Sequence, residues 1–400
     1  MKVLWVNTNF MHPTTKGGQI RTLEMLRHLH CWHEIHYVAI ADPSQHEGPA
    51  RASEYSFRSY PYRYKIPRQG SLEFWLKATS SMPSPVPLAV SRFHPSGMGP
   101  FLETLIQRER FDRAVVDHLA PTAYFPDLSR ALLFQHNVET IIWRRRLEHA
   151  SGALKRWYIG LQARRMYEYE RRVSLRAGHV VTVSSKDSAA MRDLFGVDRL
   201  SEVPTGVNLE YFRRPEEPGS NFADLVFVGS MDWLPNVDGV LYFVREVLPL
   251  VRRRRPECSL AIVGRTPPRE IQALSEADPR IQVTGTVADI RPYLWGATVS
   301  IVPLRIAGGT RLKIFEAMAA SIPVVSTTIG AEGLLVHPPD DIRIADDPQV
   351  FADHCLDLLD DPTARERTIA RAFEMVNAEF SWEQAARSFE NILSSGPRLN

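Results

Sequence analysis

The feature that most constrains the fold is a short apolar run followed by a glycine or proline turn, which recurs through the second half of the chain. Runs of this kind lie at 225–228, 260–263, 281–284, 299–302 and 323–327. Between them, apolar residues have helical spacing at 240–250, 269–277 and 311–320. Uninterrupted apolar runs are typical of strands buried on both faces of a parallel sheet. The alternation therefore predicts βαβ units in a doubly wound α/β sheet, which binds ligands at the carboxyl ends of its strands.

The first half repeats this pattern less regularly, with apolar runs at 3–6, 36–40, 113–116, 131–134 and 179–183. A helical pattern from Ile20 to Leu29 follows the first run. Residues 51–100 are rich in Ser, Pro, Arg and aromatic side chains, which predicts an irregular insertion or a flap over this domain. We expect two Rossmann-like domains that face a cleft, with a boundary near 204–208.

The composition fits a two-domain globular protein. The chain has 400 residues, of which 44% are hydrophobic and 24% charged. Its three cysteines are odd in number and widely spaced, so they predict reduced thiols and neither a disulfide framework nor a metal site. No apolar run approaches the roughly 18–20 residues that span a bilayer, and the N-terminus reads as a strand and not as a signal peptide. These features predict a cytoplasmic protein.

The two halves differ in charge, although the whole chain carries +2. Up to Thr205 there are 28 Lys and Arg against 19 Asp and Glu, a balance of +9, and the remainder carries −7. Opposite signs favour two domains with different partners, and drift in surface composition is the alternative interpretation.

The strongest local motif is the loop at 303–320. After the strand that ends at Pro303 come Gly308 and Gly309, and Thr310 can cap a helix that begins near Arg311. Free N–H groups at such a helix start bind anions, and Arg311 and Lys313 add two cations suited to a diphosphate. An ordinary helix start with surface cations is the alternative.

Several stretches resemble the retaining glycosyltransferases of family 4, and among these the sugar transferases of bacterial exopolysaccharide clusters. The resemblance to their donor domain is carried by 226–236, 262–265, 285–293, 303–320 and 323–334. The resemblance to their acceptor domain is carried by 7–18, His118 and 136–139. Members have the GT-B fold, in which two Rossmann-like domains face each other across a cleft.

The resemblance implies an acceptor-binding domain over 1–205, a nucleotide-sugar-binding domain over 206–375 and a C-terminal helix, 376–400, that crosses back to the first domain. It also implies transfer of a sugar, with retention, from a UDP- or GDP-linked donor to a hydroxyl of a glycan or lipid-linked glycan. We expect neither a metal ion nor a further cofactor, because cations of the protein take the place of a divalent ion.

One departure from the family pattern concerns its E-x7-E signature. Glu316 matches the second acid, which binds the ribose of the nucleotide. The first acid, which usually contacts the transferred sugar, would fall at Gly308. We expect the backbone N–H groups of Gly308, Gly309 and Thr310 to take over its role.

A second departure concerns the cations that hold the diphosphate. Many relatives carry an Arg and a Lys after the first strand of the donor domain, and the matching positions here are Ser230 and Asn236. We therefore expect Arg311 and Lys313 to bind the diphosphate and to stabilise the leaving group. Arg265 and the backbone near Val287 fit the nucleoside pocket.

In the first domain, Gly17 and Gly18 form a turn where the backbone can approach a phosphate, and the family uses this loop near the donor diphosphate. His118 follows a predicted strand and matches the active-site histidine of the family. His136 and Glu139 follow the next strand and are candidates for the acceptor side. The alternatives are an ordinary core or surface histidine and, at 137–139, a helix cap.

A basic stretch at Trp143–Arg176 combines ten Lys and Arg residues with aromatic and aliphatic side chains. Such a helix can lie on an anionic membrane, which would place the protein peripherally on the inner face of the cytoplasmic membrane, near a lipid-linked acceptor. The alternative is the solvated face of a packed helix. No nucleic-acid recognition motif accompanies the charge, so we expect no nucleic-acid partner.

Two other function classes stay open on the sequence. A nucleotide-sugar epimerase or a phosphorylase could share the fold, although Gly308 argues against the dense carboxylates an epimerase needs. A non-catalytic nucleotide-sugar-binding or membrane scaffold protein is the other alternative. A dehydrogenase is disfavoured, because G-x-G-x-x-G follows the first strand of neither half.

Overall fold

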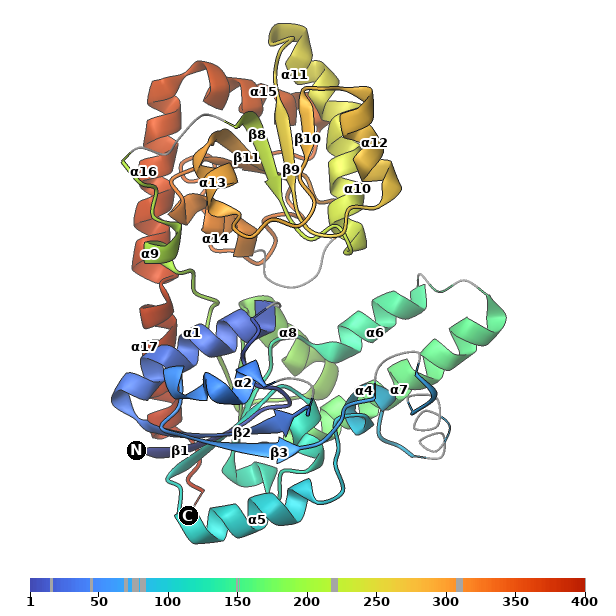
Figure 1. The fold of residues 1–400 in the computed structure, drawn as a ribbon, viewed down its shortest axis with the longest axis vertical. Helices are drawn as coiled ribbons and strands as arrows, with labels where there is room; N and C mark the ends of the chain where they lie inside the picture. Colours follow the sequence, from blue (N-terminus) through green and yellow to red (C-terminus); the bar gives the residue numbers. More distant parts are fainter. Residues whose placement is uncertain are drawn as a thin grey trace. The chain divides into compact units, whose positions relative to one another are not determined.

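The computed structural model describes residues 1–14, 17–43, 46–67, 71–73, 79, 84–148, 150, 152–216, 222–306 and 312–399. The chain divides into two compact units (Figure 1). Unit 1 comprises Met1–Thr205 and Ala385–Asn400, and unit 2 comprises Gly206–Gln384. The second unit therefore extends beyond the boundary expected at 375, and the last helix joins unit 1 only from Ala385. Which unit binds donor and which binds acceptor stays a prediction.

Unit 1 is built on a parallel sheet of order β3-β2-β1-β4-β5-β6-β7. Its strands are β1 (Lys2–Val6), β2 (Glu34–Ala41), β3 (Arg58–Arg63), β4 (Arg113–Asp117), β5 (Leu132–Phe134), β6 (His179–Thr182) and β7 (Leu200–Glu202). Strands β1, β2 and β4 are almost wholly buried, as their uninterrupted apolar sequences predict.

The helices of unit 1 are α1 (Gly17–Trp32), α2 (Glu47–Ala50), α4 (Leu88–Ser91), α5 (Met98–Glu109), α6 (Glu139–Glu148), α7 (Ala153–Arg176), α8 (Ser185–Phe195) and the last helix, α17 (Trp382–Ser395). Single-turn 3₁₀ segments lie at Ala52–Glu54, Ala120–Ala123 and Leu128–Arg130. Helix α8 shows why the sequence folds this way, since Ser184 caps its start and Gly196 ends it with φ 72°. Helices α6 and α7 pack together as a hairpin that extends away from the sheet (Figure 1).

Unit 2 has the same architecture, with a parallel sheet of order β10-β9-β8-β11-β12-β13. Its strands are β8 (Ala223–Val228), β9 (Leu260–Val263), β10 (Ile281–Val283), β11 (Ala297–Val302), β12 (Val324–Ser326) and β13 (Arg343–Ile344). Its helices are α9 (Leu209–Phe212), α10 (Leu234–Tyr242), α11 (Leu248–Arg254), α12 (Arg269–Ala277), α13 (Arg291–Trp295), α14 (Leu312–Ala319), α15 (Pro348–Asp360) and α16 (Pro362–Glu379). The π-helical turn η4 (Phe243–Val247) joins α10 to α11 within the stretch predicted as one helix.

The C-terminal part of α17 completes the core of unit 1. The ring of Phe389 packs against Trp5 and Phe134, with ring centroids 5.4 and 5.1 Å apart. The guanidinium of Arg113 donates to the carbonyl oxygens of Leu393 and Ser394, which fixes the end of this helix against β4. In the part of the chain that the structure describes, no helix combines the length and apolar character that crossing a membrane requires.

The expectation of an irregular insertion at 51–100 is wrong in one part. Residues 58–63 form β3, which pairs with β2 as a regular edge strand. Its sequence, RSYPYR, does not predict a strand, because it contains Pro61 and three polar residues. An edge strand tolerates both, because one of its sides makes no ladder bonds.

Each sheet reverses its strand order once, between β1 and β4 in unit 1 and between β8 and β11 in unit 2. Ligands of doubly wound sheets bind outside the carboxyl ends of the strands at this reversal. Ligand-binding side chains are therefore expected at the carboxyl ends of β1 and β4 and of β8 and β11.

Candidate functional site

In unit 2 the turns after β8 and β9 lie in direct contact at the carboxyl edge of the sheet. The amide of Gly229 donates to the carbonyl of Val263 over 2.9 Å. A Cβ added to Gly264 would lie 1.8 Å from the carbonyl oxygen of Gly229, so only glycine fits there. The contact brings the segments after both strands to one place.

Four residues predicted from the sequence meet at this edge, and we call Ser230, Asn236, Arg265 and Lys313 the β8-edge cluster. The ammonium of Lys313 donates to Oδ1 of Asn236 over 2.9 Å, and Nδ2 of Asn236 donates to the carbonyl of Ser230 over 2.7 Å. The Nε of Arg265 donates to Oγ of Ser230 over 2.7 Å. The sequence therefore identified residues that the fold brings together.

Local structure explains how Lys313 and Asn236 reach each other. Asn236 lies in the first turn of α10, after β8, and Lys313 lies in the first turn of α14, after β11. The Lys313 ammonium lies over the ring of Phe227, 4.3 Å from its centroid. A Cβ on Gly229 would come within 2.7 Å of that ammonium, so this glycine keeps the space open. Two helix N-termini and the Lys313 ammonium thus meet at this edge, which favours an anion.

Glu316 lies one turn after Lys313 on the same face of α14. Burial raises the pKa of Glu316 to about 7, and the charge of Lys313 opposes this shift. Burial raises the pKa of Tyr211 in α9, and the negative charges of Asp289 and Glu316 add to this shift. Tyr211 was missed in the sequence, where it lies in an unremarkable segment after the domain boundary. Its ring is covered by the Arg291 guanidinium, 4.0 Å from the ring centroid.

Of the remaining donor-site predictions in unit 2, the described residues include only Val287. Gly308, Gly309, Thr310 and Arg311 lie outside the described residues. Val287 is half-buried, and its side chain packs against the core of unit 2.

In unit 1 the carboxylate of Asp117, the last residue of β4, is fully buried among donors from β1 and α1. Its Oδ2 accepts hydrogen bonds from Trp5 Nε1, Asn7 Nδ2 and Thr22 Oγ1 at 3.0, 2.7 and 2.8 Å. Sequence analysis missed this residue. The available signal was an acid placed directly before His118 at the end of an apolar strand.

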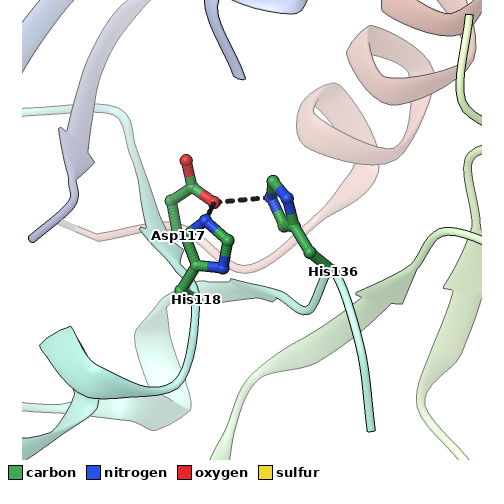
Figure 2. A group of neighbouring side chains, drawn as sticks. All are labelled: Asp117, His118 and His136. Carbon is green, nitrogen blue, oxygen red and sulfur yellow. Dashed lines mark ion pairs between the residues drawn. The ribbon is translucent and has the colours of Figure 1, made fainter. Parts of the chain in front are cut away.

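His118 and His136 lie together beside this carboxylate, and we call Asp117, His118 and His136 the Asp117 cluster (Figure 2). The Nε2 atoms of His136 and His118 lie 2.8 and 3.9 Å from Oδ1 of Asp117. The two imidazoles have ring centroids 3.8 Å apart. His118 has a left-handed backbone, with φ 71°, and its side chain is 35% exposed, whereas His136 is 2% exposed.

Gly18, in the first turn of α1, lies directly over the two imidazoles. A Cβ on Gly18 would be 3.3 Å from Cε1 of His118 and 3.5 Å from Nδ1 of His136. Both ring nitrogens of His136 are buried, and neither makes a hydrogen bond within the residues that the structure describes, although Nε2 lies close to Asp117 Oδ1. Gly17 is the first residue of α1.

Desolvation favours the neutral form of both imidazoles. Desolvation lowers the pKa of His136 to about 3, against the attraction of Asp117, and it also lowers the pKa of His118. Burial would raise the pKa of Asp117, but the imidazoles of His136 and His118 and the bond from Thr22 hold it well below its ordinary value.

Arg21 supplies a buried cation near this cluster. Desolvation lowers the pKa of Arg21 to about 10, although Asp187 and Asp117 attract its charge. Its guanidinium donates to Oγ1 of Thr205. Sequence analysis also missed Arg21, because it lies within an ordinary amphipathic helix pattern.

The Asp117 cluster has the ligand types of a metal site, since one ligand atom from each of its residues lies within 4.8 Å of the others. Neutral imidazoles are the form that binds a metal. Arg21, however, already places a positive charge near Asp117, which disfavours a second cation. The expectation that no metal takes part stays a prediction.

Glu139 is the first residue of α6, and a side chain from α7 caps the start of this helix. The buried carboxylate of Glu170 in α7 accepts hydrogen bonds from the amides of Glu139 and Thr140 and from Oγ1 of Thr140, at 2.9, 2.7 and 2.6 Å. Burial raises the pKa of Glu170 to about 7 and also raises that of Glu139. The segment at 137–139 therefore leads into the capped start of α6. A role of Glu139 in binding the acceptor substrate stays a prediction.

Comparison with known proteins identifies the family of the domain in unit 2. Residues 223–361 match the family model described as glycosyl transferases group 1, and this part of the chain is a domain of that family. An uncharacterized 44.6 kDa protein in the cps region of Klebsiella pneumoniae is 22% identical over 64% of this chain and 66% of its own length. A GDP-mannose-dependent monoacylated alpha-(1-6)-phosphatidylinositol monomannoside mannosyltransferase of Corynebacterium glutamicum is 26% identical over 49% of this chain. That alignment spans 56% of the mannosyltransferase, so the chain covers less than two thirds of both relatives.

Solved structures resemble the chain over almost its whole length. Sucrose-phosphate synthase from Thermosynechococcus elongatus has a TM-score of 0.71 at 17% identity, covering 98% of both chains. Anabaena HepE in complex with UDP and glucose has a TM-score of 0.64 at 12% identity, covering 99% of this chain and 100% of HepE. These likenesses show the fold, which is that of GT-B glycosyltransferases.

Proposed function

We propose that this protein is a glycosyltransferase that moves a sugar from a nucleoside-diphosphate sugar to an acceptor hydroxyl, with retention of configuration and without a metal ion. The observation that carries the proposal is the β8-edge cluster. It places a cation and two helix starts at the strand reversal of a glycosyl transferases group 1 domain. Doubly wound sheets bind nucleotides at this position.

The leaving group of such a reaction is a nucleoside diphosphate, on which negative charge grows in the transition state. In the proposed mechanism Lys313 stabilises this charge, while Asn236 holds the ammonium in place through Oδ1. A positioned donor of this kind contributes roughly 2.7–4 kcal/mol to transition-state stabilisation. Arg311, in the loop before α14, is proposed to act with Lys313.

Glu316 is proposed to accept hydrogen bonds from the ribose hydroxyls, because it lies one turn deeper on α14 than Lys313. Ser230 and Arg265 then lie on the nucleoside side of the diphosphate. The base is proposed to be uracil or guanine. HepE was solved with UDP and glucose, and the corynebacterial relative uses GDP-mannose, so both bases occur among similar proteins.

The Asp117 cluster is proposed to bind the transferred sugar and the acceptor. A neutral imidazole carries one donor and one acceptor, so His118 can hydrogen-bond a sugar hydroxyl. Asp117 is proposed to orient His136 through Nε2, which leaves Nδ1 as an acceptor for a hydroxyl proton. This arrangement would serve a glycan or lipid-linked acceptor.

Transfer is the test of the proposed activity. UDP- and GDP-sugars are incubated with a panel of glycan and lipid-linked acceptors, and products are identified with and without acceptor. Lys313→Met is expected to reduce transfer by about 100-fold or more. The exposed Arg253→Met, at the end of α11, is the matched control and keeps full activity. Binding without turnover would support a scaffold protein, and sugar isomerisation without acceptor would support an epimerase.

We also propose that the α6–α7 hairpin contacts an anionic membrane at the inner face of the cytoplasmic membrane. Near the start of α7, Leu154 and Trp157 are 79% and 58% exposed. Arginine and lysine side chains flank them at 144–146, 155–156 and 164–165. Exposed apolar side chains with surrounding cations are typical of interfacial anchors.

Liposome sedimentation tests this contact. Replacing Leu154 and Trp157 together by Ala is expected to reduce binding to anionic liposomes about tenfold, because two apolar side chains no longer leave water. Phe57→Ala, which removes an aromatic side chain that is 63% exposed elsewhere in unit 1, is the control. Equal loss in both variants, or no loss in either, would favour a solvated face.

A further inference from the structure

A polar cavity lies in unit 2, at the edge of the sheet opposite to the β8-edge cluster. Its volume is about 220 Å³, and its lining includes the starts of β11 and β12 at Ala297 and Pro323. Parallel strands begin at one edge and end at the other, and β11 rises about 17 Å between them. The cavity is therefore separate from the β8-edge cluster.

Two arginines line this cavity, Arg214 from the segment before β8 and Arg365 from the first turns of α16. None of the described residues that line it is an aspartate or a glutamate. Both side chains line the same cavity, and partial desolvation together with the charge of Arg365 lowers the pKa of Arg214. Like charges that share a cavity are stabilised by a bound counter-ion.

The remaining lining includes both polar and apolar side chains. Thr298 and Ser321 carry hydroxyl groups, while Trp295 and Ile369 are apolar. Ser321 has a left-handed backbone, with φ 58°, where α14 ends. The carbonyl groups at the C-terminus of α14 carry partial negative charge and could pair with the arginines. Those of Ala317 and Met318, however, already accept hydrogen bonds from the amides of Ile322 and Ser321.

We propose that this cavity, the Arg214–Arg365 pocket, is a binding site for a small phosphate anion. Two guanidiniums match the geometry of phosphate oxygens, and the hydroxyls add donors. The volume is below the roughly 300–1,000 Å³ of sites that take drug-sized ligands, so a small ion or phosphomonoester fits. Trp295 in the lining gives an apolar surface for the sugar of such an ester.

The test measures binding of inorganic phosphate and of glucose 6-phosphate to the full chain, by calorimetry at constant ionic strength. Arg214→Gln and Arg365→Gln are each expected to weaken binding about tenfold or more, because each removes charge-assisted hydrogen bonds. Arg213→Gln is the matched control. That arginine is adjacent in sequence but pairs with Glu210 and does not line the pocket.

A Lys313→Met variant separates this pocket from the proposed donor site. Phosphate binding that persists in Lys313→Met and is weakened in both pocket variants supports the proposal, and binding that both pocket variants retain overturns it. Tighter binding of glucose 6-phosphate than of phosphate would identify a monoester as the ligand, and the reverse would identify the free ion. Binding of neither anion to the wild-type chain contradicts the proposal.

A measurement on the wild-type chain decides the question if the pocket variants do not fold. Phenylglyoxal labels accessible arginines, and peptide masses report the rate at each site. Phosphate is expected to slow labelling of Arg214 and Arg365 several-fold while leaving Arg213 unchanged. Equal rates at all three positions with and without phosphate would overturn the proposal.

Discussion

Replacing Asp117 by Asn removes a buried charge while keeping the shape of the side chain. Three hydrogen bonds to Oδ2 then change from charge-assisted to neutral. Bonds to a charged group contribute about 1.5–3 kcal/mol each and neutral ones about 0.5–1.5, so the three together lose about 3 kcal/mol. The loss of the nearby anion also leaves the buried Arg21 less well compensated, which adds to the cost.

Thermal melts followed by circular dichroism measure this effect. A loss of about 3 kcal/mol corresponds to a fall in the midpoint of roughly 6–12 °C for a domain of this size. Asp198→Asn, at an exposed carboxylate of the same unit, is the control and is expected to stay within about 0.5 kcal/mol of the wild type. A change at Asp117 as small as that of the control would refute the proposed electrostatic role.

The pH dependence gives an independent check. Because the folded state holds the pKa of Asp117 below its ordinary value, the carboxylate stabilises the fold above the unfolded pKa of about 4. This stabilisation is lost as the pH falls through the lower, folded-state pKa. The difference between wild type and Asp117→Asn should therefore be greatest near pH 7 and shrink below about pH 4.

Other predictions concern Glu316 and two glycines. Because the pKa of Glu316 is raised to about 7, the folded state favours its protonated form, and the stability this gives is lost as the pH rises from about 4 to 7. The thermal unfolding midpoint of Glu316→Gln should therefore rise relative to that of the wild type as the pH is raised from 5 to 8. The same change should weaken UDP or GDP binding more than it lowers kcat. An unchanged nucleotide affinity would exclude the ribose role. Gly264→Ala should lower the free energy of unfolding by about 1–3 kcal/mol or more in urea titrations, because its Cβ would lie 1.8 Å from the carbonyl of Gly229. Gly160→Ala, inside α7 with only an ordinary contact to Leu147, should instead raise it by up to about 1 kcal/mol, and similar effects of both changes would contradict the packing argument.

The sequence predicted the central strands well, because their signal is local. Residues 260–263 and 113–116 are apolar at almost every position, which is typical of a strand buried on both faces of a parallel sheet. It also named Ser230, Asn236 and Lys313 separately as donor-binding candidates, and the structure brings these residues from three segments into contact. The parallel topology explains this result, since the ends of neighbouring strands must meet at one edge.

The environment of the Asp117 cluster was not predictable in the same way. The donors to Asp117 come from residues 5, 7 and 22, more than 90 positions away in the chain, and no local pattern encodes such pairing. The low pKa of His136 depends on burial, which a histidine next to an asparagine does not reveal. Edge strand β3 was missed because its polar sequence is permitted only by its place in the sheet.

A crystal structure of the protein with UDP or GDP bound tests the central claim most directly. A diphosphate oxygen within about 2.7–3.2 Å of the Lys313 ammonium, with the ribose hydroxyls at Glu316, is the expected result. A nucleotide bound away from the ends of β8 and β11, with the Lys313 ammonium still held only by protein atoms, would contradict the account.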